Sequence, residues 1–141
     1  MITQEDIFAI SSKKEFEKIQ SFAKQRTPLC LNQVPGSLKS LLFAVSARAA
    51  GTHHLALLPD HETAAYFFND VEAFLPRESV LFFPSTGTEP YAETDPDSSS
   101  LLLRAEVLDQ LSQKSKQPQI VVTYPEALAE KVINRQSVEQ N

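Results

Sequence analysis

The chain has 141 residues, of which 42% are hydrophobic, so it can bury the core of one domain or of one piece of a larger protein. Its formal net charge of −5 argues against a nucleic-acid-binding surface over the whole chain. The single cysteine, Cys30, lies in an apolar run, which predicts a buried thiol in a reducing cytoplasm. No apolar stretch approaches the roughly 18 residues of a membrane span, and residues 1–12 lack a signal-peptide core. A cytoplasmic protein without membrane association is expected.

Residues 1–27 are predicted to form helices. A short first helix is expected at residues 3–10. Ser12 and Glu15 form a capping box, which predicts a second helix that ends near Arg26.

From residue 28 onward, short apolar runs alternate with helical patterns. The apolar runs predict strands at residues 29–31, 55–58, 80–83 and 120–122. The first two helical patterns run from Leu38 to a stop at Gly51 and from a cap at Asp60 to Pro76. The third is indicated by the spacing of Leu101, Ala105, Leu108 and Leu111. The fourth begins at a capping box of Thr123 and Glu126 and ends at about Val132. This alternation predicts an α/β fold of three layers, with a mostly parallel sheet and helices on both faces.

The segment that precedes the first of these helices resembles a phosphate-binding loop. It ends in Lys39-Ser40, as the motif G-x-x-x-x-G-K-[ST] does, but Gln33 and Leu38 replace both glycines. Leu38 adds a branched side chain where the backbone of a working loop approaches phosphate. Gly36 is the residue expected at the turn. The pattern therefore predicts a degenerate P-loop NTPase or helicase-like fold that binds no cofactor.

A second missing feature supports this interpretation. In a working NTPase a carboxylate after a later strand organises Mg²⁺, whereas the strand at 120–122 ends in Thr123-Tyr124. The alternative is a small P-loop-like nucleotide-binding or phosphotransfer domain, because a lysine at a helix N-terminus still favours anions.

Other polar residues indicate neither catalysis nor metal binding. His53, His54 and His61 match no compact zinc spacing and are expected at a strand start and in an exposed helical turn. No G-x-S-x-G elbow is present. The loop at residues 84–100 carries acidic side chains that could act as acid and base, but a loop this polar favours solvated carboxylates: Glu89, Glu93, Asp95 and Asp97. No catalytic residue and no metal ligand is predicted.

Several weak patterns in order resemble the UvrB-like N-terminal module of the transcription-repair coupling factor (Mfd) family, and specifically its first α/β subdomain. They are the loop at 33–40, the strand and helix at 55–76, residues 80–91, Arg104, and residues 121–128. The resemblance divides the chain into N-terminal helices at 1–27, the UvrB-like subdomain at 28–132, and a polar tail at 133–141 that leads to a following domain.

The resemblance implies a function in transcription-coupled nucleotide excision repair of DNA damage. Proteins of this family are DNA translocases that displace stalled RNA polymerase and recruit UvrA. Their motor, a helicase-type hydrolase that uses ATP and Mg²⁺ and binds DNA, would lie outside this chain, as would the domains that contact UvrA and RNA polymerase. This fragment is expected to be non-catalytic and to bind little DNA, because residues 84–100 hold one tyrosine, Tyr91, and no cation. An interaction domain of flavodoxin-like shape, unrelated to repair, is a third interpretation.

Overall fold

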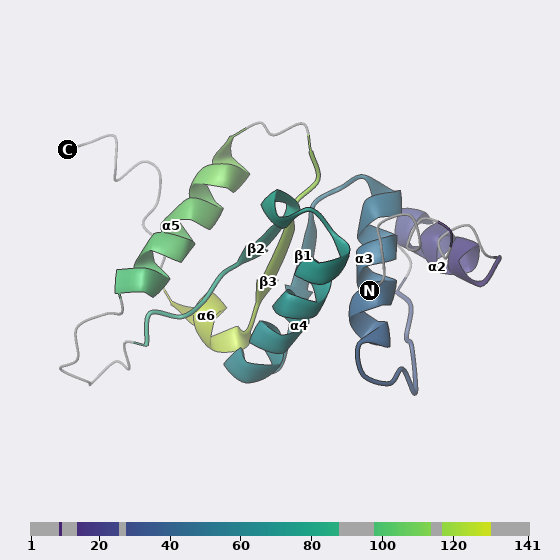
Figure 1. Cartoon of the computed structure of the whole chain (residues 1–141), viewed down its shortest axis with the longest axis horizontal. Coiled ribbons are helices and arrows are strands. Elements are labelled where there is room, and N and C mark those ends of the chain that lie inside the picture. The colour runs from purple at the N-terminus through teal and green to yellow at the C-terminus, as the bar shows by residue number, and fades with distance from the viewer. Residues whose placement is uncertain (1–8, 10–13, 26–27, 88–97, 114–116, 131–141) are drawn as a thin grey trace.

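A three-stranded parallel sheet forms the centre of the fold. The computed structural model describes residue 9 and residues 14–25, 28–87, 98–113 and 117–130. The strands in these residues are β1 (His54–Leu57), β2 (Val80–Phe82) and β3 (Ile120–Thr123). Their order in the sheet is β1-β3-β2, and both pairs are parallel (Figure 1). The α/β class and the parallel sheet are confirmed.

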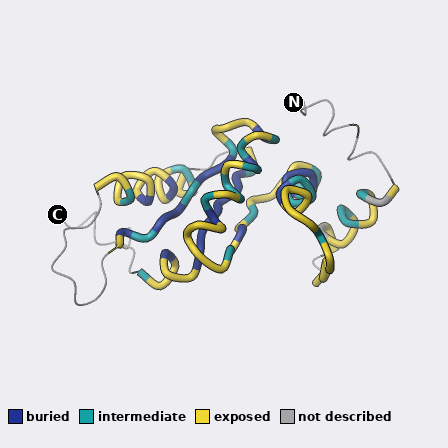
Figure 2. The backbone as a smooth tube through the Cα atoms, turned by 60° about the horizontal axis from the view of Figure 1, so that its bottom comes forward, coloured by how far each residue is buried: buried dark blue, intermediate teal, exposed yellow. Residues whose placement is uncertain are grey.

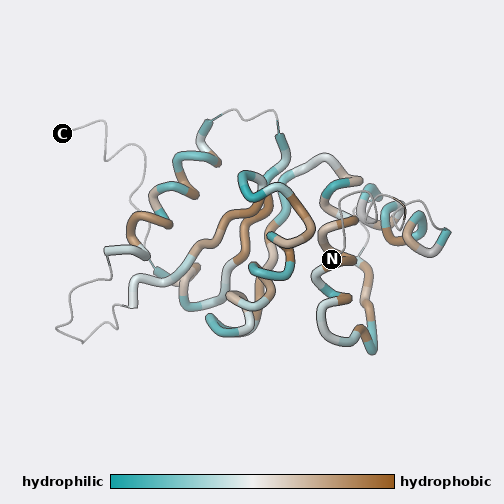
Figure 3. Tube along the Cα trace, in the orientation of Figure 1, coloured by the Kyte–Doolittle hydropathy of each residue, from teal (hydrophilic) through white to brown (hydrophobic). Residues whose placement is uncertain are grey.

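The last of the described strands, β3, is the central strand of the sheet. All residues of β3 are buried, because it pairs with a neighbour on each side. Its β-branched side chains suit a strand that is covered on both faces. Figure 3 shows β2 and β3 among the most hydrophobic segments of the chain. By contrast, β1 is an edge strand, and its Leu55 and Leu57 side chains are 57% and 56% exposed.

Five α-helices accompany the sheet in the described residues. They are α2 (Lys14–Gln25), α3 (Leu38–Ala50), α4 (His61–Phe74), α5 (Ser98–Ser112) and α6 (Pro125–Ala129), with a 3-10 turn at Arg77–Ser79. As predicted, Gly51 ends α3 in the left-handed conformation, with φ 61°. Asp60 caps α4, since its side chain accepts a hydrogen bond of 2.7 Å from the backbone N–H of Thr63. Of the two expected N-terminal helices, the second is confirmed as α2, and the first lies outside the described residues apart from residue 9.

Helices α4 and α5 cover opposite faces of the sheet, which confirms the predicted layers. The ring of Phe82 contacts Phe68 of α4, at a centroid distance of 5.4 Å. The next residue, Phe83, lies under the guanidinium of Arg104 of α5, at 4.2 Å. Because successive side chains of an extended chain point to opposite sides, the two helices lie on different faces.

The predicted strand at residues 29–31 is wrong. The structure has no strand there, and Leu29 and Leu31 are 43% and 47% exposed. Cys30, predicted to be buried, is exposed as well. A short apolar run becomes a strand only when another strand pairs with it, and periodicity cannot supply that partner.

The residues that face the sheet from α5 also differ from the predicted pattern. The residues whose spacing predicted this helix, Leu101, Ala105, Leu108 and Leu111, are all exposed. Arg104 and Val107 are buried instead. Figure 2 accordingly colours most of α5 as exposed. The sequence of α5 is apolar around much of its circumference, so tertiary contacts rather than an apolar stripe decide its rotation.

The second predicted capping box is wrong. Thr123 belongs to β3, and its hydroxyl donates a 2.8 Å hydrogen bond to the carbonyl oxygen of Phe83. Tyr124 occupies the N-cap position of α6, and Pro125 lies in the first turn as predicted. The helix ends at Ala129, before the expected end near Val132. Among the described residues, no helix has both the length and the apolar character needed to cross a bilayer.

Candidate functional site

The turn before α3 holds the residues of the predicted degenerate loop. Gly36 has φ 45°, which confirms it as the turn residue, and the N–H of Leu38 donates to the carbonyl of Pro35 at 3.2 Å. Gln33 also has a positive φ, of 57°. This left-handed conformation favours glycine, the residue that the intact motif has at this position. Hence the backbone at Gln33 has a left-handed conformation, which glycine adopts more readily than glutamine.

The two residues that end the motif, Lys39 and Ser40, lie in different environments. Ser40 is buried, and its hydroxyl donates a 3.1 Å hydrogen bond to Oδ2 of Asp70 on α4. Lys39 is exposed. In an intact loop the serine hydroxyl would bind Mg²⁺, whereas here it joins two helices. Leu38 is 41% exposed at the start of α3.

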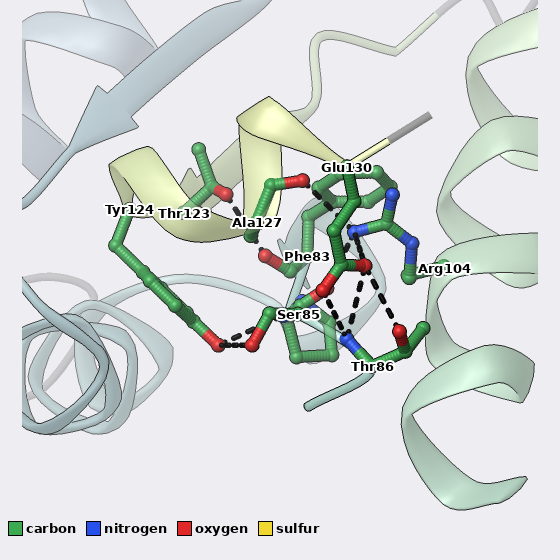
Figure 4. Close-up of polar contacts among 9 residues, drawn as sticks. Phe83, Ser85, Thr86, Arg104, Thr123, Tyr124, Ala127 and Glu130 are labelled. Atoms are coloured by element: carbon green, nitrogen blue, oxygen red, sulfur yellow. Dashed lines mark hydrogen bonds and ion pairs between the residues drawn. The ribbon is translucent and has the colours of Figure 1, made fainter. Parts of the chain in front are cut away.

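A second group of residues, joined mainly by polar contacts, lies where β2 and β3 end, and we call it the Arg104 cluster (Figure 4). It comprises Phe83, Ser85, Thr86, Arg104, Tyr124, Ala127 and Glu130. Its positions agree with the general location of ligand sites in parallel sheets, at the carboxyl ends of the strands. The cluster joins the segment after β2 to α5 and α6.

Arg104 is the centre of the cluster. Its side chain is 7% exposed, and its Nη1 donates to the carbonyl oxygens of Pro84 at 2.7 Å and Ala127 at 3.0 Å. The same nitrogen lies 3.3 Å from the Glu130 carboxylate. The guanidinium stacks on the Phe83 ring. Its Nη2 is buried and has no hydrogen-bond partner within the described part of the chain.

Two further contacts fix the segment after β2. The Glu130 carboxylate accepts hydrogen bonds from the backbone N–H of Thr86, at 2.8 and 3.0 Å, and from its hydroxyl, at 3.1 Å. The Tyr124 hydroxyl accepts a 2.8 Å hydrogen bond from the backbone N–H of Ser85 and lies 3.0 Å from the Ser85 hydroxyl. Most polar groups of the cluster are therefore bonded to one another, which rigidifies the end of the sheet.

From the sequence, Arg104 stood out only through the family resemblance, and the cluster was not predicted. A signal was present, since Arg104 stands three positions before Val107 in a stretch of α5, residues 101–108, whose other residues are apolar except for Glu106. A charged residue on a buried helical face requires partners, and these come from residues far away in the sequence.

The histidines lie as predicted and do not converge. His54 begins β1, and His53 accepts a 3.2 Å hydrogen bond from the backbone N–H of Gln119. His61 is exposed in the first turn of α4, and its ring contacts Tyr124 edge-on at 5.4 Å. Within the described residues, no group of three His, Cys, Asp or Glu side chains could hold a metal ion.

The acidic side chains predicted in the long loop lie outside the described residues. They are Glu89, Glu93, Asp95 and Asp97, together with Tyr91.

The fold and the Arg104 cluster define an α/β domain with a parallel sheet whose carboxyl end is closed by its own polar side chains. The chain is 34% identical over 73 residues to the transcription-repair-coupling factor of Rickettsia bellii (strain RML369-C). That match covers 52% of this chain and 6% of the relative, so the chain spans a small part of that protein's length. No protein-family model matches the chain, and no solved structure matches it significantly. The comparison indicates a region related to a transcription-repair-coupling factor.

Proposed function

We propose that this chain is a non-catalytic, UvrB-like module of a transcription-repair coupling factor. The observation that carries the proposal is the partial similarity to such a protein, at 34% identity over 73 residues. The α/β fold with its parallel sheet is compatible with the first subdomain of that module. The resemblance adds the P-loop ancestry of the fold, the N-terminal helices at 1–27, the subdomain at 28–132 and the tail at 133–141.

The geometry of the turn before α3 supports the non-catalytic part of the proposal. The Ser40 hydroxyl bonds Asp70, so a Mg²⁺ ion would have to displace that contact. Leu38 carries its side chain where an intact loop has glycine. Lys39 alone offers only a mobile, solvated cation to a phosphate. Nucleotide binding at this turn would therefore be weak.

The activity of the whole protein belongs to other parts of it. ATP and Mg²⁺ would be bound by a separate translocase motor, which would also bind DNA. RNA polymerase and UvrA would contact further domains, and this module would serve as the scaffold that positions the UvrA-binding surface. The net charge of −5 is consistent with little DNA binding by this fragment.

Calorimetry tests the non-catalytic role directly. The 141-residue chain is titrated with ATP in excess Mg²⁺, with Lys39→Ala as the matched variant. We expect no heat of binding at millimolar ATP for either protein. Micromolar affinity that Lys39→Ala abolishes would refute the scaffold role and favour the alternative, a small nucleotide-binding or phosphotransfer domain.

A cellular assay tests the repair context. Repair of ultraviolet lesions is measured separately on the transcribed and the non-transcribed DNA strand, with and without the gene that encodes this chain. Loss of the gene should slow repair of the transcribed strand only. Equal repair of both strands in the two strains would contradict the assignment to transcription-coupled repair.

A further inference from the structure

A cavity with a volume of ≈ 400 Å³ lies between α3 and β1. Figure 1 shows α3 beside β1, on the side away from β3. Most of the lining is apolar, and Leu42, Phe43 and Ala56 are among the residues that supply it. The Phe43 ring contacts the rings of Phe67, at 5.4 Å, and His54, at 5.9 Å, both edge-on. These contacts hold the ring in place, so one wall of the cavity is already packed.

Among the described residues, the lining of this cavity holds one free cation and no carboxylate. Lys39 and Ser46 are the polar side chains that line it. The Ser46 hydroxyl donates a 2.7 Å hydrogen bond to the carbonyl oxygen of Leu42, so its donor is already used. The Lys39 ammonium has no hydrogen-bond or ion-pair partner in the described part of the chain. A negatively charged group is therefore complementary to this lining.

The start of α3 favours the same sign of ligand charge. Lys39 lies in the first turn of this helix, and that turn holds no acidic residue. Ser37 occupies the N-cap position without a side-chain hydrogen bond to the helix. The partial positive charge of the helix N-terminus is thus not compensated by the side chains of its first turn, and it adds to the positive potential around Lys39.

Two other cavities of the described residues are less suited to an anion. One, of ≈ 230 Å³, has Arg48 as its cation, and this side chain already interacts with another group of the chain. The other, of ≈ 300 Å³, is lined by Arg77 together with Glu78 and Glu106. Arg77 pairs with Glu72 at 3.5 Å, and the carboxylates at this cavity would repel an anion. Of the three cavities, the one beside α3 therefore has the strongest preference for an anionic ligand.

The volume of this cavity limits the size of the ligand. Since an apolar protein cavity of about 150 Å³ holds one benzene molecule, a volume of ≈ 400 Å³ has room for roughly two or three rings. In a cavity of this kind the apolar contacts supply most of the affinity, and a single polar partner fixes the orientation of the ligand.

We propose that the cavity between α3 and β1 binds a small amphipathic anion, with an apolar body of roughly two or three ring volumes and one carboxylate or sulfonate group. The apolar body lies against Leu42, Phe43 and Phe67, and the anionic group pairs with Lys39. Because the ligand contacts both α3 and β1, it stabilises the folded chain by mass action.

Such a ligand differs from a nucleotide. A triphosphate carries several negative charges and binds together with Mg²⁺, whereas this cavity offers one cation. Ser40, which would bind Mg²⁺ in an intact loop, is bonded to Asp70 and does not line the cavity. The ligand site does not depend on the proposed role in DNA repair.

Calorimetry with 2-naphthoate and its neutral analogue 2-naphthamide tests the site. The two ligands share the same ring system and differ in charge. We expect 2-naphthoate to bind the wild-type chain with a Kd below about 1 mM. In Lys39→Gln its affinity should fall roughly two- to fivefold, as for an exposed ion pair, while 2-naphthamide binds both proteins equally. Lys24→Gln, at an exposed position of α2, is the matched control and should leave both affinities unchanged.

A blocking variant and a positional measurement locate the ligand. Leu42→Trp places a larger side chain in the cavity, so it should weaken the binding of both ligands at least roughly tenfold while the circular dichroism spectrum stays unchanged. In nuclear magnetic resonance spectra, bound 2-naphthoate should show nuclear Overhauser contacts to the Ala56 methyl group and to the Phe43 ring.

The site is refuted if 2-naphthoate does not bind at several millimolar, if its contacts lie elsewhere on the chain, or if Lys39→Gln binds it as tightly as the wild type does. Displacement of 2-naphthoate by millimolar ATP would also overturn the proposal, because the cavity would then be a nucleotide site. If Leu42→Trp unfolds, the contacts to Ala56 and Phe43 in the wild-type chain decide the location.

Discussion

Replacing Arg104 by methionine should strongly destabilise the fold. The guanidinium is almost fully buried, donates to the carbonyls of Pro84 and Ala127, and pairs with Glu130. Arg104→Met keeps much of the volume of the side chain and its contact with the Phe83 ring, but it removes every donor. Two carbonyl oxygens then lose a donor, and the Glu130 carboxylate loses its cation and keeps only the hydrogen bonds from Thr86.

The expected loss in the free energy of unfolding follows from these contacts. Removing one member of a buried ion pair costs about 3–5 kcal/mol, because the other charge stays behind without a partner. The Glu130 side chain is 20% exposed, so water can partly replace the arginine there. The buried Nη2 without a partner already lowers the net contribution of Arg104. We therefore expect the lower end of the range, about 3 kcal/mol in the free energy of unfolding.

Urea unfolding followed by circular dichroism measures this loss. With an m-value of about 1–3 kcal/mol/M, the midpoint should fall by roughly 1–3 M. Glu130→Gln keeps an acceptor for Thr86 and should cost only about 1 kcal/mol. The double variant should lose less than the sum of the two single losses, since the pair interacts directly. A loss below about 0.5 kcal/mol for Arg104→Met would show that the cluster does not hold the sheet end together.

Three further predictions concern the helices. Ser40→Ala should lower the free energy of unfolding by about 1 kcal/mol, because Asp70 loses its donor, while ATP titrations stay unchanged; a large change in ATP binding would contradict the structural role of the hydroxyl. Val107→Ala should cost about 2 kcal/mol in urea unfolding and the matched Leu102→Ala less than about 0.5 kcal/mol, and the reverse order would show that α5 is rotated differently. The hydrogen bond from the Thr63 backbone N–H holds the pKa of Asp60 below its ordinary value of 3.8. The Asp60 carboxylate therefore stabilises the fold above pH 3.8, and this contribution is lost as the pH falls through the lower pKa of the folded state. Asp60→Ala should remove this part of the acid dependence in a pH series of thermal melts, and an unchanged acid limb would refute the cap.

The regular elements of the fold were largely predictable from local patterns. The end of α3 at Gly51 and the cap of α4 at Asp60 depend on residues close in the sequence. The strands 55–58, 80–83 and 120–122 were each confirmed to within about a residue, because continuous apolar runs bounded by polar residues indicate strands, although the first of them is an exposed edge strand and not a buried one. Parallel pairing followed from their alternation with helices.

The candidate site was less predictable, because its parts are distant in the chain. The motif at 33–40 indicated a turn and a helix start, yet nothing near Ser40 shows that its hydroxyl meets Asp70, 30 positions later. Thr86 and Glu130 are 44 positions apart. Arg104 stands in a helix whose leucines suggested another buried face.

Some features of this protein are therefore set by local sequence, and others are set only by tertiary contacts. Hydrophobic periodicity, turn residues and helix caps act over a few residues, so the order of the confirmed helices and strands, the α/β class and the turn before α3 are all present in the linear sequence. The central position of β3, the open edge of β1, the rotation of α5 and the closure of the Arg104 cluster depend on which segments meet. That choice depends on burial and on partners for buried polar groups, and both exist only once the chain has folded.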